Sequence, residues 1–325
     1  MQGLVTVFGG SGFVGAQVVR ALAKRGFRVR VAVRNPGRGY RLQMLGDVGQ
    51  IQVTQANIRV PSSIDRALDG AEACVNLVGV LYETGRQKFQ SLHAMGVQNI
   101  AEAAAAKGVS RFVQVSALGA DAGSPSKYAR TKAMGEAAVR GLIPGATVLR
   151  PSIVFGPEDH FFNRFGAMAA LAPALPLIGG GHTRYQPVFV GDVAAAVANA
   201  LVDPNAPGRL YELGGPGVYS FKDLMQLVLR ETGRKALLVP VPFALASLIG
   251  AAGDLQAALI PPILTSDQVE LLRADNVVSP GAAGLKDLGV EATLLEAVLP
   301  SYLFRYRRGG QYADQLTNAT PGAKS

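Results

Sequence analysis

A glycine pattern near the start of the chain constrains the fold more than any other feature. The segment VTVFGGSGFVGAQVVRAL (residues 5–22) places Gly9, Gly12 and Gly15 between an apolar run and a helical pattern. In such a strand–turn–helix unit the first glycine permits a tight turn and the second lets backbone approach a pyrophosphate. The third lets the helix pack closely, and the helix N-terminus favours an anion. The predicted dinucleotide contacts are Gly9, Gly10, Ser11, Gly12, Phe13, Val14 and Gly15.

Short apolar runs alternate with helical patterns through the first two hundred residues. Six of these runs are typical of strands: 4–8, 28–34, 51–57, 73–79, 111–117 and 146–156. Alternation of this kind predicts a parallel sheet with helices on both faces. The predicted fold class is therefore α/β, a doubly wound parallel-sheet Rossmann fold with a smaller, mainly helical C-terminal lobe.

The same patterns divide the chain into domains. We predict a nucleotide-binding domain over residues 1–156, to which about 185–215 return with a further strand–helix–strand pattern. Residues 157–184 and 216–308 are assigned to the lobe. Residues 309–325 lack apolar periodicity and are predicted to form a flexible tail.

The charge distribution favours an anionic binding partner. The chain of 325 residues has a formal net charge of +9, and residues 1–46 contain basic but no acidic side chains. A basic surface suits nucleotide phosphates, an acidic protein or anionic lipid. Nucleic acid is disfavoured, because the basic residues do not form one run with interleaved aromatics. The three histidines are widely spaced and lack neighbours at ligand spacing, so no metal site is expected.

Targeting and membrane signals are absent from the pattern. The first predicted strand begins near Gly3, which leaves no room for a signal peptide. No uninterrupted apolar run reaches the roughly 20 residues of a membrane span. The longest, 239–264, is broken by prolines and by Asp254. A soluble or membrane-peripheral protein is expected.

The ends of the next predicted strands carry further candidate contacts. Arg34 stands after the second strand, where proteins that prefer NAD place a carboxylate on the ribose 2′-hydroxyl. An arginine there suits a 2′-phosphate, so NADP(H), bound as NADPH, is predicted in preference to NAD(H). Asn57 ends the third strand and is expected to face the adenine. Leu77, Val78 and Gly79 follow the fourth strand and are expected to line the ribose side.

A tyrosine and a lysine in KYARTKAMGE lie four residues apart, at Tyr128 and Lys132. On a helix this spacing places both side chains on one face. A phenol beside an ammonium can act as a proton donor in hydride chemistry, because the cation favours the phenolate. The pair is therefore a candidate acid–base site.

Together these motifs resemble the extended or atypical short-chain dehydrogenase/reductase superfamily over roughly residues 3–230. The motifs are GxxGxxG, NLVG, Tyr128-x-x-x-Lys132, LRPSIVFGP and PVFVGDVAAAV. The resemblance implies that Tyr128 is the general acid–base, that Lys132 binds the nicotinamide ribose and lowers the tyrosine pKa, and that Ser116 polarises the substrate. It also places Pro151 among the cofactor contacts. Two departures weaken the catalytic interpretation: only eleven residues separate Ser116 from Tyr128, and His93 replaces an asparagine.

A narrower resemblance extends to about residue 312. It rests on GPEDHFFNRF, TRYQPVFVGDVA, PPILTSDQVELLRADNVVS and LPSYLFRYRRGGQY. These segments are similar to the nucleotide-binding accessory subunits of respiratory complex I in alphaproteobacteria and mitochondria. The resemblance implies tightly held NADPH without turnover, and a role in assembly or stability where the peripheral arm meets the membrane arm. It also implies other complex I subunits and anionic lipid as partners, at the cytoplasmic face of the inner membrane, which corresponds to the mitochondrial matrix side.

Two alternatives stay open at this point: a free NAD(P)-dependent oxidoreductase, epimerase or dehydratase, and a nucleotide-ratio sensor. Tyr128 and Lys132 do not separate them, since both would also contact the cofactor in a protein that only binds it. The segment YLFRYRRGG (302–310) likewise has two interpretations. It could dock on an acidic or lipid surface, or cover the lobe core with a solvated basic edge.

Overall fold

A seven-stranded parallel sheet organises the N-terminal part of the protein. The computed structural model describes residues 2–257 and 260–310. The strands are β1 (Gln2–Phe8), β2 (Phe27–Val33), β3 (Ile51–Gln55), β4 (Ala73–Asn76), β5 (Arg111–Val115), β6 (Thr147–Pro151) and β11 (Leu210–Leu213). Their order is β11-β6-β5-β4-β1-β2-β3, with every neighbouring pair parallel. The order reverses between β1 and β4, and doubly wound sheets bind ligands at the carboxyl ends of strands at such a switch point.

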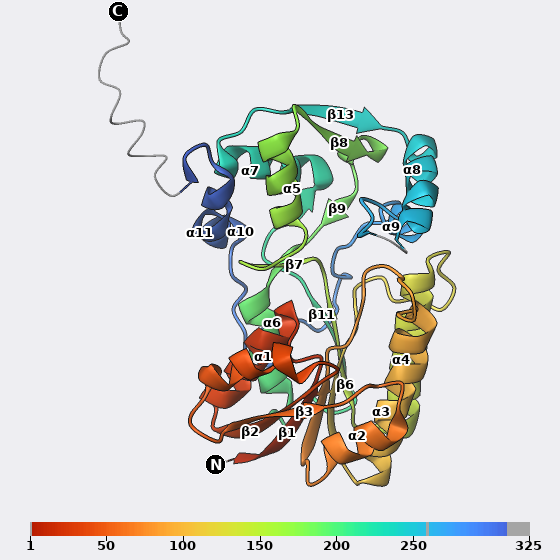
Figure 1. Cartoon of the computed structure of the whole chain (residues 1–325), viewed down its shortest axis with the longest axis vertical. Coiled ribbons are helices and arrows are strands. Elements are labelled where there is room, and N and C mark those ends of the chain that lie inside the picture. Colours follow the sequence, from red (N-terminus) through yellow and green to blue (C-terminus); the bar gives the residue numbers. More distant parts are fainter. Residues whose placement is uncertain (1, 258–259, 311–325) are drawn as a thin grey trace, which may run out of the picture.

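Helices cover both faces of this sheet. On one face lie α1 (Phe13–Lys24) and α6 (Val190–Ala200); on the other lie α2 (Pro61–Leu68), α3 (Met95–Ala106) and α4 (Lys127–Leu142) (Figure 1). Each helical layer packs on its own apolar core, centred on residues such as Leu22 and Val197 on one face and Ile64 and Ile100 on the other. Because both faces are covered, a central strand such as β4 is buried at every residue.

The lobe lies beyond the carboxyl edge of the sheet (Figure 1). Its helices are α5 (Phe162–Leu171), α7 (Phe221–Thr232), α8 (Phe243–Gln256), α9 (Ser266–Leu271), α10 (Leu295–Val298) and α11 (Pro300–Leu303). Short strand pairs accompany them: β8 (Ala174–Ile178) with β13 (Leu237–Val241), β9 (Arg184–Tyr185) with β12 (Tyr219–Ser220), and β7 (Val154–Phe155) with β10 (Val188–Phe189). A third apolar core, rich in phenylalanine, holds the lobe together.

The predicted fold class is confirmed, and each of the six predicted strands corresponds to a strand of the sheet. Within the lobe, residues 174–178 form β8, which pairs in parallel with β13. The predicted tail lies almost wholly outside the described residues. None of the described helices is both long and apolar enough to cross a membrane.

The aromatic segment near the C-terminus covers the lobe core. The side chain of Tyr302 is buried, and its hydroxyl donates to Asp159 Oδ2 at 2.5 Å. Tyr306 donates to Asn163 Oδ1 at 3.0 Å, and Arg307 Nε donates to the Glu231 carbonyl at 2.8 Å. The structure therefore supports the second interpretation of this segment, in which its aromatic rings pack inward.

Candidate nucleotide-binding site

The turn after β1 has the backbone geometry that the glycine pattern predicts. Gly9 has φ +81°, in the left-handed region that favours glycine. The Gly12 amide donates to the Gly9 carbonyl at 3.1 Å, and the Ala16 amide donates to the Gly12 carbonyl at 2.9 Å. The chain therefore turns tightly at the end of β1 and enters α1 at Phe13.

The next two glycines of the pattern meet different surroundings. A methyl group on Gly15 would lie 2.7 Å from Gly10 Cα and closer still to the Gly9 carbonyl oxygen. Gly15 thus allows α1 to contact the turn directly. Gly12 is exposed, and a methyl group there would approach only the Gly9 oxygen, at 3.4 Å. The space at Gly12 is open to solvent beside the first amides of α1, where an anion is favoured.

The other predicted contacts lie along the same edge of the sheet. A methyl group on Gly9 would be 3.1 Å from Leu77 C and Val78 N, so the glycine turn touches the loop after β4 at the switch point. Arg34 is exposed directly after β2, and half-buried Asn57 lies two residues beyond β3. Strand order places these two on one side of the switch point. It places Ser116, after β5, and Pro151, at the end of β6, on the other.

Helix α4 brings Tyr128 and Lys132 to the β5 side of this edge. Lys132 Nζ lies 5.7 Å from the centroid of the Tyr128 ring. A methyl group on Gly79 would lie 3.2 Å from the same Nζ, so the ammonium points to the loop after β4. The structure thus brings together Tyr128, Lys132 and the loop that was predicted to line the ribose.

Burial, rather than ion pairing, dominates the electrostatics of this pair. It lowers the pKa of Lys132 to about 8, against a smaller opposing effect of Glu136. Burial, together with a smaller effect of the carboxylate of Asp267, raises the pKa of Tyr128 to about 12. The resemblance implied a lowered tyrosine pKa, whereas this arrangement disfavours the phenolate.

His93 is held neutral beside the pair. It belongs to a π-helical turn (Gln90–Ala94), where its Nε2 accepts from the Val80 amide at 3.0 Å and its Nδ1 lies 3.3 Å from Thr131 Oγ1. Burial, together with a smaller effect of the nearby charge of Lys132, lowers the pKa of His93 to about 2. Since Nε2 accepts, the proton resides on Nδ1, and the ring orients the loop after β4 rather than moving protons.

Two carboxylates that the sequence interpretation did not assign to the site anchor α4. Glu136, one turn beyond Lys132, binds Arg150 of β6 through two hydrogen bonds of 2.9 and 2.6 Å. Asp267 of the lobe accepts three hydrogen bonds at the start of α4, from Ser126 Oγ and from the amides of Lys127 and Tyr128. Neither contact has a local sequence signal, because the partners are 14 and about 140 residues apart.

Ser116 tests whether a ligand fits this edge. Its hydroxyl is buried and has no hydrogen-bond partner in residues 2–257 and 260–310. A buried polar group left in this way is costly, which indicates that a polar ligand group completes the site. The glycine turn would hold the phosphates, and Lys132 and Ser116 would face the nicotinamide end. A nicotinamide cofactor bound there would supply hydride-transfer chemistry.

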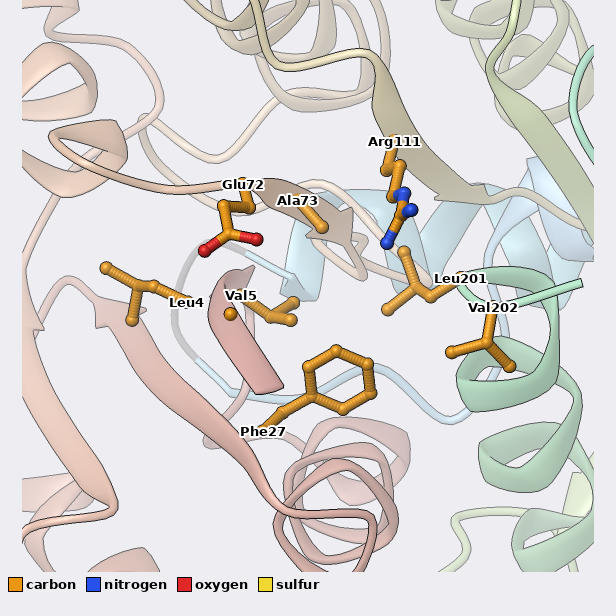
Figure 2. Close-up of a pocket in the computed structure, with 9 residues that line it drawn as sticks. Leu4, Val5, Phe27, Glu72, Ala73, Arg111, Leu201 and Val202 are labelled. Carbon is orange, nitrogen blue, oxygen red and sulfur yellow. The ribbon is translucent and has the colours of Figure 1, made fainter. Parts of the chain in front are cut away.

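A separate hollow lies at the opposite edge of the sheet. Figure 2 shows its lining, which includes Leu4, Phe27, Glu72, Arg111 and Leu201. The volume of the hollow is about 280 Å³. These residues lie at the amino ends of the strands and beyond α6. Ligands of doubly wound sheets bind at the carboxyl ends, so this hollow is separate from the candidate site.

Comparisons with known proteins agree with this architecture. Residues 5–214 match the NAD dependent epimerase/dehydratase family. NADH dehydrogenase (ubiquinone) 1 alpha subcomplex subunit 9, mitochondrial, of Arabidopsis thaliana is 36% identical over 320 residues, which cover 95% of this chain and 80% of that protein. Ceramide reductase of Caulobacter vibrioides is 32% identical over 243 residues, 74% of each chain.

A solved structure shows the same fold at lower sequence similarity. Triphenylmethane reductase of Citrobacter sp. superposes with a TM-score of 0.74 at 20% identity, covering 92% of this chain and 99% of that one. The glycine turn, the strand order and the matches in sequence thus agree. The chain belongs to the NAD dependent epimerase/dehydratase family and, within it, to the group that includes NADH dehydrogenase (ubiquinone) 1 alpha subcomplex subunit 9.

Proposed function

We propose that this protein is a non-catalytic, NADP(H)-binding accessory subunit of respiratory complex I that supports assembly or stability where the peripheral arm meets the membrane arm. The observation that carries the proposal is the extent of the sequence match. The Arabidopsis subunit aligns over 95% of the chain, which includes most of the lobe, whereas the Caulobacter reductase aligns over 74%. The lobe is the part of the chain in which a subunit and an enzyme of this fold would differ.

The choice of NADPH over NADH rests on Arg34. Its guanidinium is exposed directly after β2, at the side of the switch point where the adenosine end of a dinucleotide lies. One charge-assisted hydrogen bond contributes roughly 1.5–3 kcal/mol, so a single contact with a 2′-phosphate gives about a ten- to hundredfold preference.

A holding role for Tyr128 and Lys132 fits their environment. The pKa of Tyr128 is raised to about 12, which leaves the phenolate scarce at neutral pH. The neutral ring of His93 packs edge-on against Tyr128 at 5.3 Å and supplies no charge to assist ionisation. The pair can still bind a ribose through the neutral hydroxyl of Tyr128 and the ammonium group of Lys132. Binding without turnover is therefore the chemistry that this arrangement favours.

The lobe presents a surface suited to partners. Helix α8 exposes Leu245, Leu248, Ile249 and Leu255, with exposed fractions between 43 and 82%. A contiguous apolar helix face on a monomer is typical of an interaction site. Other complex I subunits, with anionic lipid at the cytoplasmic or matrix face of the membrane, are the partners that this proposal assigns to it.

A reductase is the second candidate, and Ser116 favours it. A buried hydroxyl without a hydrogen-bond partner among the described residues, at the same edge of the sheet as a tyrosine and a lysine, is the arrangement that would polarise a carbonyl substrate. The Caulobacter relative is named as a reductase. An enzyme requires Tyr128 for its function, whereas an accessory subunit does not.

A deletion and complementation experiment separates the two candidates. The gene would be deleted in the source organism, and assembly of the respiratory complex measured by native electrophoresis together with NADH:ubiquinone activity. We expect the deletion to reduce both, and the wild-type gene and a Tyr128→Phe variant to restore both. Unchanged assembly in the deletion strain would contradict the proposal. Restoration by wild type but not by Tyr128→Phe would favour the enzyme.

A further inference from the structure

One carboxylate of the lobe closes the start of the helix that carries Tyr128 and Lys132. Asp267, in α9, accepts from the Lys127 amide at 2.5 Å with Oδ1. Its Oδ2 accepts from the Tyr128 amide at 3.1 Å and from Ser126 Oγ at 2.9 Å. The same Ser126 hydroxyl accepts from the Ala129 amide and so caps α4. Asp267 therefore completes the cap of α4 from a distant part of the chain.

The next residue of α9, Gln268, contacts the loop after β4, on the other side of the candidate site. Gln268 Nε2 lies 3.5 Å from the carbonyl oxygen of Leu81, two residues beyond Gly79. In Figure 1, α9 lies between α8 and the upper end of α4. The first turn of α9 thus meets both segments that flank Lys132 Nζ, the start of α4 and the loop after β4.

On its lobe side this turn is packed tightly under α8. A methyl group on Gly250 would lie 2.8 Å from Ser266 N, and one on Gly253 would lie 3.0 Å from Leu264 C. Asp254 Oδ2 also accepts from the Ser266 amide, at 3.4 Å. Side chains cannot intervene between α8 and the segment 264–266. A displacement of Asp267 would therefore displace α8 as well.

Residues 276–279, which follow α9 in the chain, are held by contacts that do not involve α4. Asn276 Oδ1 accepts from Ser152 Oγ at 2.7 Å, and the Ser279 amide donates to Glu212 at 2.7 Å. These contacts join residues 276–279 to the ends of β6 and β11. The first turn of α9 contacts α4, whereas residues 276–279 are attached to the sheet. This turn can therefore respond to what happens at the candidate site while residues 276–279 stay in place.

We propose that Asp267 is a positioning residue that couples nucleotide binding at α4 to the placement of the α8 face of the lobe. The inference rests on the proposed function, because it requires a nucleotide in contact with Tyr128 and Lys132. A bound nucleotide orders the first turns of α4 and so presents the Lys127 and Tyr128 amides to Asp267. Coupling is reciprocal: anchoring by Asp267 raises nucleotide affinity by the same factor. The α8 face is then fixed only when the nucleotide is in place.

Hydrogen exchange on the full-length protein tests this coupling. Amide exchange would be measured with and without saturating NADPH at the glycine turn (9–15) and at α9 (266–271). The variants are wild type, Asp267→Asn, which removes the charge and one acceptor oxygen, and Glu270→Gln. Glu270 is a control on the same helix, because its carboxylate binds Arg273 and does not reach α4.

We expect NADPH to slow exchange in wild type about five- to tenfold at both the glycine turn and α9. Asp267→Asn should keep the effect at the glycine turn, lose it at α9, and bind NADPH more weakly by a similar factor. Glu270→Gln should behave as wild type. If Asp267→Asn unfolds, Ser126→Ala, which removes one of the three hydrogen bonds, should give a partial loss.

Two results would overturn the coupling alone: slowing at the glycine turn of wild type with none at α9, or unchanged slowing at α9 in Asp267→Asn. A different result would contradict the proposed function itself. If NADPH slows exchange at neither segment of the wild-type protein, the glycine turn is not a nucleotide site, and the proposed coupling is refuted as well.

Discussion

Substitution of two glycines in the turn after β1 should separate folding from nucleotide binding. At Gly15 a methyl group would overlap the backbone of Gly9 and Gly10, so either the turn or α1 must move. Overpacking of this kind costs roughly 1–3 kcal/mol, partly offset by the better helix propensity of alanine, about 1 kcal/mol. We therefore expect Gly15→Ala to lower the free energy of unfolding by about 1 kcal/mol and to abolish binding.

At Gly12 the geometry predicts a loss of nucleotide binding with little change in stability. Its φ of −79° suits alanine, and a methyl group would meet only the Gly9 oxygen at 3.4 Å. Loss of a good N-cap residue and reduced freedom of the unfolded chain nearly cancel, so stability should change by less than about 1 kcal/mol. The methyl group would, however, occupy the space into which a pyrophosphate must come.

Urea unfolding and titration with NADPH measure the two effects. Gly12→Ala should weaken binding at least about tenfold at nearly unchanged stability. If Gly12→Ala binds NADPH as wild type does, phosphates do not approach the turn at Gly12, and the assignment of the site is wrong. If Gly15→Ala is as stable as wild type and binds normally, the argument from close packing is refuted.

Further substitutions test other parts of the account. Arg34→Asp should weaken NADPH binding about ten- to hundredfold and NADH binding less than about threefold, because only NADPH carries the 2′-phosphate; equal losses in a titration would contradict the NADP(H) assignment. The pKa of His93 is about 2 in the folded protein, so below its usual pKa only the unfolded chain takes up the proton. Wild type should therefore lose about 1 kcal/mol of stability between pH 6 and 5 that His93→Gln does not lose, and parallel curves would show that the ring is not held neutral. Tyr302→Phe removes a hydrogen bond to the buried carboxylate of Asp159 and should cost roughly 1.5–3 kcal/mol in urea unfolding. Tyr306→Phe, whose hydroxyl bonds a neutral amide, should cost about 1 kcal/mol or less, and the reverse order would contradict the role of Asp159.

Local patterns in the sequence were sufficient for the sheet and the glycine turn. Apolar runs separated by helical periods correspond to β1 to β6, and the positive φ of Gly9 follows from the requirement of a tight turn. The predicted contacts Arg34, Asn57 and Ser116 all follow strands of one parallel sheet, so their common edge follows from topology. Features fixed by neighbouring residues are thus readable from sequence.

Features that depend on contacts between distant parts of the chain could not be predicted from the sequence. Strand β8, ALPLI, contains a proline and pairs with β13, about sixty residues later, so its sequence resembles a loop. Asp267 lies in a short helix of the lobe, and nothing near it indicates that it caps α4. The pKa of Tyr128 depends on burial by several elements and on that same carboxylate. The lowered tyrosine pKa that the resemblance implied therefore did not account for burial, which has the largest effect on the pKa of Tyr128.

The most direct test of the central claim is the composition of the native complex. The protein would be extracted gently from its membrane and separated by size under native conditions. Its companions would be identified by mass spectrometry, and the nucleotide released on denaturation would be quantified. The account predicts migration with the large NADH dehydrogenase assembly and one NADPH per chain. A free monomer or dimer with readily exchanged or no nucleotide would contradict it.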